Sequence, residues 1–213
     1  MILPSIEEIE LCQSPNIWDL GNESLYNLCT ENFDHSTSEK IIAKVWLIGR
    51  AYAAAIERRK KSEKDKESFN DKFYETDVVD TFKNSNIDDY LTKLKSIKDI
   101  SSSSLNEVLD VHKYLVDIIK KITNLEKRSF CSKYLHFHLP NIFFIYDSRA
   151  YYAMQDIKLG KIPLEYSINM SKTRDEVYFK FCIKCLYLRD KIKEEFDIQL
   201  TPRQLDNLLL NRF

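Results

Sequence analysis

Glycine and proline are scarce in this chain, with 3 glycines and 5 prolines among 213 residues. A β-sheet needs such residues at the turns that join its strands. Their scarcity therefore predicts an all-α fold, and an apolar fraction of 44% is ample for a buried core. At this length we expect a single helical domain, 1–213, whose two lobes, 1–100 and 101–213, share a central cleft.

Apolar side chains recur at intervals of three and four residues in several segments, which predicts amphipathic helices. The longest are expected at about 39–61, 105–122 and 174–195. Shorter helices are expected between 78 and 98 and after Thr201. In the first long helix, alanines would let a neighbouring helix approach closely. Its expected buried stripe consists of Ile42, Val45, Trp46, Gly49, Tyr52, Ala53 and Ile56.

Capping patterns mark several of the expected helix ends. Ser104 and Glu107 have the spacing of a capping box, and Thr201 precedes a proline at the first position of the last helix. The helix at 174–195 is expected to be capped within 171–173. Interruptions in the first 37 residues are expected at Pro4, Pro15 and Gly21.

The segment 129–150 places reactive side chains next to a strongly apolar run, so it is the first candidate for a functional site. Its first half is predicted to be a helix that carries Ser132, Lys133, Tyr134, His136 and His138. The run 141–146 is apolar and aromatic and ends at Asp147. Asp-Ser after such a run is an N-cap signature, because the carboxylate accepts hydrogen bonds from the N–H groups of the next turn. We therefore expect Asp147 at the start of a helix.

The order of a helix, Pro140, a short apolar connector and Asp147 at a helix start resembles the catalytic segment of helix-hairpin-helix DNA glycosylases. The resemblance covers about residues 100–155. It implies a DNA-glycosylase-like fold, with double-stranded DNA carrying a modified or damaged base as the partner. It also implies that Asp147 is a catalytic carboxylate, which stabilises the positive charge that develops on the sugar or activates a water as the N-glycosidic bond breaks.

Segments of the form SKYLHFH…P…IYDSRA, with an upstream helix like GRAYAAAIERR, also resemble a group of bacterial proteins. This second resemblance implies a bacterial setting. Defence against modified phage DNA and repair of damaged DNA are then equally expected roles.

The chain departs from the glycosylase pattern at the hairpin. Residues 125–129 read Leu-Glu-Lys-Arg-Ser in place of Leu-Pro-Gly-Val-Gly, without the glycines that bring backbone N–H groups close to DNA phosphate. Members that also cut the strand use a lysine a little under twenty residues before the Asp, whereas Lys133 lies fourteen residues before Asp147. The resemblance therefore implies base excision without a Schiff-base lysine, or Lys133 reaching in from a rearranged loop.

Cations and an aromatic residue near these segments are candidates for binding DNA. Arg149 is expected to pair with Asp147 or to hold a phosphate. Lys127 and Arg128 are expected to contact phosphate or simply to face solvent. The opposite wall of the cleft would be lined by Arg50 and Tyr52.

His136 and His138 are candidate ligands, bases or readers of a base edge, and at least one is expected to be a satisfied core histidine. Residues two apart on a helix point to different faces, so they are poor partners for one metal. Cys182 and Cys185 have no second pair, and five cysteines without regular spacing argue against a disulfide framework. We expect neither a metal nor a cofactor.

Charge is unevenly distributed along the chain. The first 40 residues hold eight acidic side chains and one basic one, so the remainder is basic. If the protein handles DNA, we expect the acidic segment to lie away from the site and the basic groups to gather on it. The basic candidates are Arg58, Arg59, Lys60, Lys61, Lys127, Arg128, Lys133, Arg149, Lys172 and Arg174.

The N-terminal sequence lacks the apolar core of a secretory signal, and no run reaches the ~18 apolar residues of a membrane span. We therefore expect a cytoplasmic protein; its oligomeric state stays open. Two alternatives to a glycosylase remain. One is a non-catalytic nucleic-acid-binding or protein-interaction module on a degenerate glycosylase scaffold, which the missing glycine hairpin favours. The other is a helical toxin-type ribonuclease. It is ranked last, because Arg128 and His136 are too far apart in the sequence for its Arg–His motif.

Overall fold

The computed structural model describes residues 2–58, 70–167 and 173–212. Within these ranges every regular element is a helix and no β-strand occurs, so the all-α prediction is confirmed. The elements are α1 (Ile6–Gln13), α2 (Asp19–Glu31), α3 (Ser38–Ala51), α4 (Asn70–Phe73), the π-helix η2 (Tyr74–Val78), α5 (Val79–Lys83), α6 (Ile87–Leu94), α7 (Leu105–Thr123), α8 (Arg128–His138), α9 (Ser148–Asp156), the 3-10 helix η3 (Leu164–Ser167), α10 (Glu176–Phe196) and α11 (Pro202–Asn211).

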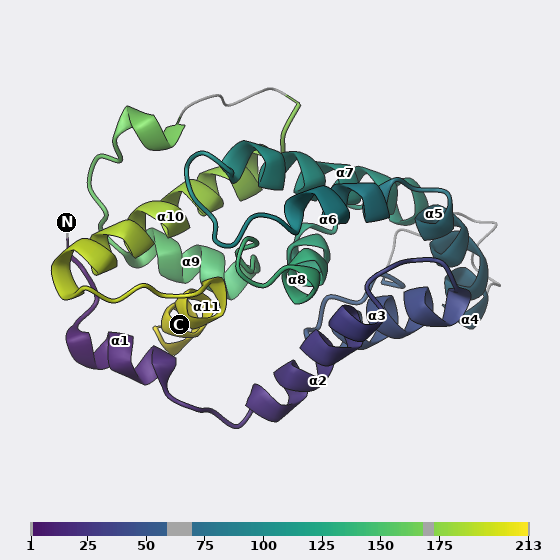
Figure 1. The fold of residues 1–213 in the computed structure, drawn as a ribbon, viewed down its shortest axis with the longest axis horizontal. Coiled ribbons are helices and arrows are strands. Elements are labelled where there is room, and N and C mark those ends of the chain that lie inside the picture. The colour runs from purple at the N-terminus through teal and green to yellow at the C-terminus, as the bar shows by residue number, and fades with distance from the viewer. Residues whose placement is uncertain (1, 59–69, 168–172, 213) are drawn as a thin grey trace.

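Helix α8 lies in the middle of the fold (Figure 1). It packs against α2, α3 and α7, and α7 is in turn covered by α5 and α6. Toward the other end, α10 packs on α9, α9 on α11, and α11 on α1. Residues 14–18 link α1 to α2, so this linker joins the group around α11 to the group around α8 (Figure 1).

The burial of α8 explains why its sequence combines apolar and reactive side chains. All nine residues from Phe130 to His138 are buried. The extended connector that follows is also buried, so its backbone polar groups need partners inside the protein. Side chains provide them: Ser132 Oγ accepts from Tyr146 N–H at 3.0 Å, His136 Nδ1 lies 2.8 Å from the Phe143 carbonyl, and the Tyr178 hydroxyl donates to the Phe144 carbonyl at 2.7 Å.

Helix α3 ends at Ala51, ten residues before the predicted end at 61. The chain reverses there because Ala53 adopts a positive φ of 51°, and the Ala54 N–H donates to the Gly49 carbonyl at 2.8 Å. A Cβ on Gly49 would lie 3.2 Å from the Ala55 Cα. The small residues therefore permit this fold-back, where we had expected the approach of another helix. Residues 59–61 of the predicted helix lie outside the described residues.

Three smaller predictions about helix ends and faces are also wrong. Trp46 is 43% exposed, because α3 buries the face that carries Ile41, Val45 and Ile48. Ser104 precedes α7 but makes no side-chain cap; its hydroxyl accepts from the Ser101 N–H at 3.0 Å. Helix α10 is capped by Asp175, after the predicted start.

Other predictions about helix ends are confirmed. Gln204 completes a capping box with Thr201 at the start of α11. Asp147 caps α9, since its Oδ1 accepts from the Ala150 N–H at 2.9 Å. Gly21 lies inside α2, however, and does not interrupt it.

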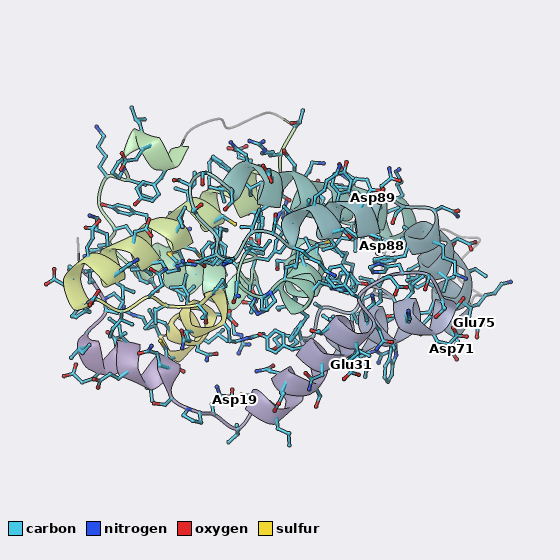
Figure 2. The ribbon with its side chains drawn as sticks, viewed as in Figure 1. Asp19, Glu31, Asp71, Glu75, Asp88 and Asp89 are labelled. Carbon is cyan, nitrogen blue, oxygen red and sulfur yellow. The ribbon has the colours of Figure 1, made fainter. Side chains whose placement is uncertain are left out.

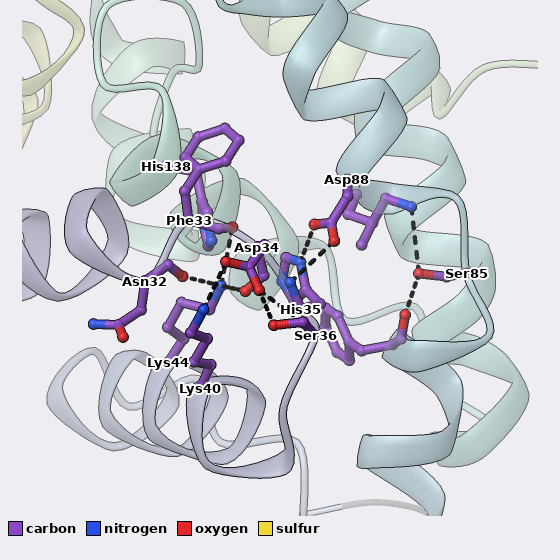
Figure 3. A network of polar contacts seen from close by, with 12 residues as sticks. Asn32, Phe33, Asp34, His35, Ser36, Lys40, Lys44, Ser85, Asp88 and His138 are labelled. Carbon is purple, nitrogen blue, oxygen red and sulfur yellow. Dashed lines mark hydrogen bonds and ion pairs between the residues drawn. The ribbon is translucent and has the colours of Figure 1, made fainter.

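A polar network holds the connection between α2 and α3 (Figure 3). Lys44, fully buried on α3, donates to the carbonyls of Asn32, Phe33 and Asp34 at 2.6, 3.1 and 2.9 Å. Burial lowers the pKa of Lys44 to about 8. Next to it, His35 Nδ1 lies 2.5 Å from Asp88 on α6. The network ties α2, α3 and α6 together around α8.

None of the helices in the described part of the chain combines the length and the apolar character needed to span a membrane.

Candidate active site

Asp147 and Lys133 meet at the junction of α8 and α9. The Lys133 Nζ lies 3.0 Å from Asp147 Oδ2, and the two side chains are 3% and 17% exposed. Asp147 Oδ1 is used for the cap of α9, so the two carboxylate oxygens have different partners. The sequence suggested both residues as catalytic candidates, and the fold brings them together.

The Lys133 ammonium group has three acceptors within hydrogen-bond distance. Besides Asp147, it donates to Ser129 Oγ at 3.1 Å and to the Tyr52 carbonyl at 3.5 Å, and it lies 5.5 Å from the centre of the Tyr52 ring. A lysine ammonium has three protons to donate, and these three acceptors use them. Lys133 therefore acts here as a fixed cation beside Asp147.

Asp147 is ionised near neutral pH. Burial works to raise its pKa, but the Lys133 charge, the Ala150 N–H and the nearby Arg149 charge outweigh burial, so the pKa of Asp147 lies below its ordinary value. A partly buried anion that is held by a cation and a helix N-terminus is a preorganised electrostatic element.

A cavity of about 1150 Å³ adjoins this pair. This is large against the roughly 300–1,000 Å³ of most small-molecule sites. Lys133, Arg149 and Tyr52 line it, whereas Asp147 is not itself a lining residue. Of the sequence-predicted site residues, these three and Asp147 thus gather in one place. The apolar part of the wall comes mainly from Leu11, Pro15, Ile17, Trp18, Leu25, Leu28, Leu47 and Leu210.

Two further charged residues at this cavity were missed from the sequence, Arg203 and Asp206 on α11. Arg203 Nη1 donates to Asp206 Oδ2 at 3.2 Å, while Arg203 Nη2 and Asp206 Oδ1 are buried without a hydrogen-bond partner among the described residues. Burial raises the pKa of Asp206 to about 6; the Arg203 charge opposes this rise and the Asp147 charge adds to it. No local sequence pattern marks these two residues, because only the packing of α11 brings them to the cavity.

A chain of hydrogen bonds connects Arg203 to the connector. Because the Phe143 carbonyl can only accept, His136 Nδ1 carries the proton and Nε2 is an acceptor. The Tyr26 hydroxyl therefore donates to His136 Nε2 at 2.7 Å and accepts from Arg203 Nε at 3.0 Å. Burial keeps the pKa of His136 well below its ordinary value, so the ring is neutral. His136 thus does not line the cavity itself but holds Tyr26, which in turn holds the lining residue Arg203.

The second histidine on α8 has a structural environment. His138 Nδ1 donates to the Tyr134 carbonyl at 2.7 Å, and its ring stacks on His35 at 5.6 Å between centroids. Burial lowers the pKa of His138 well below its ordinary value. It does not line the cavity. Its predicted roles were a ligand, a base or a reader of a base edge, with at least one of the two histidines in the core.

Arg50, Lys127 and Arg128 were predicted to bind DNA, but they do not line the cavity and instead bind groups of this chain. Arg50 pairs with Glu57 at 2.5 Å. Lys127 donates to the carbonyls of Ala55 and Arg58 at 3.2 and 2.6 Å.

Arg128 belongs with them, since its Nε donates to Asp175 at 2.6 Å and its Nη2 to Glu126 at 2.9 Å. Arg174 likewise pairs with Asp110. Of the other basic candidates, residues 59–61 and 172 lie outside the described residues. The expected gathering of cations is therefore limited to Lys133, Arg149 and the unforeseen Arg203.

The expectation that the acidic N-terminal segment lies away from the site is wrong. The end of α1, the linker and α2 form one wall of the cavity. The residues of this segment that line it are apolar or neutral, however. Asp19, at the start of α2 (Figure 2), is not among the lining residues, and neither are Glu7, Glu8, Glu10 or Glu23.

No cluster of three or more metal-ligating side chains occurs within residues 2–58, 70–167 and 173–212. Comparison of the chain with protein-family models, with curated protein sequences and with solved structures finds no match.

Proposed function

We propose that the protein is a DNA glycosylase-like enzyme of the helix-hairpin-helix type, which excises a modified or damaged base by breaking its N-glycosidic bond. The observation that carries this proposal is the Asp147 carboxylate, fixed at a helix N-terminus and 3.0 Å from a buried lysine, beside a cavity of about 1150 Å³. The order α7, turn, α8, connector, α9 supports the resemblance, and the cavity between the groups around α8 and α11 would be the cleft of a two-lobed fold.

In this proposal Asp147 stabilises the positive charge that develops on the sugar as the base leaves. A preorganised anion is well suited to this role, because it needs no reorganisation at the moment of reaction. Lys133 keeps Asp147 ionised and in place. With its three donors engaged, Lys133 is not a free amine, so we propose hydrolytic excision without strand cleavage.

Aromatic side chains at the cavity fit the handling of an extruded base. Trp18 is 71% exposed and Tyr52 is partly buried, and both line the cavity. Extruded bases are held between aromatic or apolar side chains. Arg149, exposed at α9 and without a hydrogen bond or ion pair among the described side chains, would contact the phosphate beside the extruded nucleotide. The setting would be the bacterial cytoplasm, in repair or in defence against modified phage DNA.

The test is an excision assay with a panel of duplexes that contain uracil, 8-oxoguanine, 7-methylguanine or a modified cytosine. We expect alkali-labile sites with at least one duplex, and a loss of about 100-fold or more in Asp147→Asn. Asp175→Asn is the matched control, because Asp175 is also a helix cap paired with a cation, but its partner Arg128 does not line the cavity, whereas Lys133, the partner of Asp147, does. No excision from any duplex, or full activity in Asp147→Asn, would contradict the proposal.

The second candidate is the non-catalytic binding module. It is favoured by the acidic segment that walls the cavity and by the intramolecular pairing of Arg128 and Arg174. It predicts binding of a partner without excision of any base, and binding that Asp147→Asn leaves unchanged.

A further inference from the structure

Asp206 occupies an unusual position for a carboxyl group. It lies on α11, which packs against α9, and it lines the cavity although it is only 3% exposed. Its Oδ2 accepts from Arg203, but its Oδ1 has no partner among the described residues. A buried polar atom without a partner costs free energy, so this oxygen needs an explanation.

The charged and titratable groups around Asp206 come from every neighbouring element. Arg203 is on the same helix, and α8 and α9 contribute Lys133, Asp147 and Arg149. Cys185 on α10, Tyr26 on α2 and Tyr52 after α3 also interact with its charge. Helix α1 contributes the Cys12 carbonyl, bound by Asn207, while its Glu8 pairs with Arg212. Three cations therefore face two carboxyl groups.

The pKa values of the two carboxyl groups are shifted in opposite directions. Asp147 is held as an anion by Lys133 and the start of α9, whereas burial raises the pKa of Asp206 to about 6. Two carboxyl groups with separated pKa values are the arrangement that supplies an acid and an anion in one site. The missing hydrogen bond on Oδ1 favours the same form, because a neutral carboxyl group is far less costly to bury than a carboxylate.

We propose that Asp206 is the general acid of this site and gives its proton to the departing base. The assignment rests on the proposed glycosylase function. Electrons and protons balance as follows: the C1′–N bond breaks, its electron pair goes to the base nitrogen, and the base takes the Asp206 proton. Water then adds to C1′ and releases a proton to Asp147, which passes it to solvent and returns to its anionic form. Asp206 takes up one proton from solvent. The net reaction is hydrolysis.

Other groups at the cavity are unsuited to this role. Lys133 has its protons engaged by Ser129, Asp147 and Tyr52. An arginine side chain does not release a proton in proteins. Burial raises the pKa of Tyr52 to about 12, and its hydroxyl donates to Asn22. Asp206 is the one carboxyl group among the described residues that line the cavity.

The test is the pH dependence of single-turnover excision, measured with the duplex of the panel that wild-type protein cleaves fastest. We expect the wild-type rate to fall about tenfold per pH unit above a pH near 6. Asp206→Asn should lower the plateau by about 10²–10⁴-fold and abolish this pH dependence. Asp110→Asn, on an exposed carboxylate that pairs with Arg174, should keep both the plateau and the pH dependence. A structural role for Asp206 would lower the rate without changing its pH dependence.

A second readout avoids the variant altogether. The carboxyl carbon of Asp206, followed by NMR in the wild-type protein, should titrate near pH 6. Titration near 4, or unchanged pH dependence in a folded Asp206→Asn, would overturn the assignment while leaving the glycosylase proposal intact. A wild-type protein that excises no base of the panel would overturn both.

Discussion

The Lys133–Asp147 pair is a largely buried ion pair beside the cavity, and this burial determines how much stability its loss should cost. A charge that remains buried after its partner is removed is strongly destabilising, whereas an exposed ion pair contributes little. The same pair therefore contributes to stability and to the proposed chemistry, and the two effects need separate measurements.

We predict that Lys133→Met lowers the free energy of unfolding by about 3 kcal/mol, because it leaves Asp147 without its cation. Lys113→Met is the matched control. It removes a lysine that pairs with Asp117 on the surface of α7, with side chains 30% and 48% exposed, and should cost at most about 0.5 kcal/mol. Urea unfolding of the three proteins measures both values. Equal losses in the two variants would mean that the Lys133–Asp147 pair is not buried.

Asp206 should make stability depend on pH with a sign opposite to that of most carboxylates. Its pKa is about 6 in the folded protein and 3.8 as the ordinary value, so the folded state binds the proton more tightly. The stability that this proton contributes is present below pH 4 and is lost as the pH rises through 6. At about 1.4 kcal/mol per pKa unit, the loss is roughly 3 kcal/mol.

We therefore predict that the stability of the wild-type protein, relative to Asp206→Asn, falls between pH 4 and pH 6.5. Taking the difference between the two proteins removes the common effect of carboxylates such as Asp147 and Asp175, whose pKa values are lowered. Denaturant unfolding at several pH values measures it. A difference that does not change with pH would contradict the burial of Asp206 as a neutral acid.

At the scale of elements, two helical glycines offer a direct comparison. Gly21 lies within α2 with no atom within 4 Å of an added Cβ, whereas a Cβ on Gly49 would meet the Ala55 backbone at 3.2 Å. We predict that Gly21→Ala raises the free energy of unfolding by about 0.5–1 kcal/mol, because glycine is unfavourable inside a helix. Gly49→Ala should lower it, because the backbone of the fold-back would have to move. Thermal unfolding distinguishes the two, and a stabilising Gly49→Ala would argue against the fold-back after α3.

The same elements show what the sequence can predict. Helix α7 was expected at 105–122 from its apolar periodicity and spans Leu105–Thr123, with Leu109 and Leu115 on its buried face. Local patterns suffice to predict this helix and the cap at Asp147, because apolar periodicity and N-caps depend only on residues close in sequence. The end of α3 escaped prediction because it depends on a positive φ at Ala53, which tertiary contacts impose.

Arg203 and Asp206 escaped for a similar reason. They lie more than fifty residues from Asp147 in the sequence, and only the packing of α11 on α9 brings them to the cavity. The segment 129–150 therefore predicted Lys133, Asp147 and Arg149 as site residues. Arg203 and Asp206 join them only through tertiary packing.

At the scale of the whole molecule, the acidic segment and the intramolecular pairing of cations limit how strongly DNA can be held. Arg128 is engaged by Asp175 and Glu126, whereas Arg149 is exposed and lines the cavity. We predict that Arg149→Gln reduces the slope of log affinity against log salt concentration by about 0.9, the contribution of one phosphate contact on duplex DNA. Arg128→Gln should leave the slope unchanged and should lower stability instead. Fluorescence anisotropy across a salt series measures the slopes, and the reverse pattern would move the DNA-binding face to the α7–α8 turn.

The central claim is that Asp147 stabilises positive charge on the sugar of a nucleotide bound at this cavity. The most direct measurement compares the affinity for two duplexes, one with a cationic pyrrolidine and one with a neutral tetrahydrofuran at the position of the excised nucleotide. Since a site complementary to the transition state binds its charged mimic more tightly, wild-type protein should prefer the pyrrolidine duplex by 100-fold or more. Asp147→Asn should lose that preference while still binding the neutral duplex. Equal affinities of the wild-type protein for both duplexes would contradict the account.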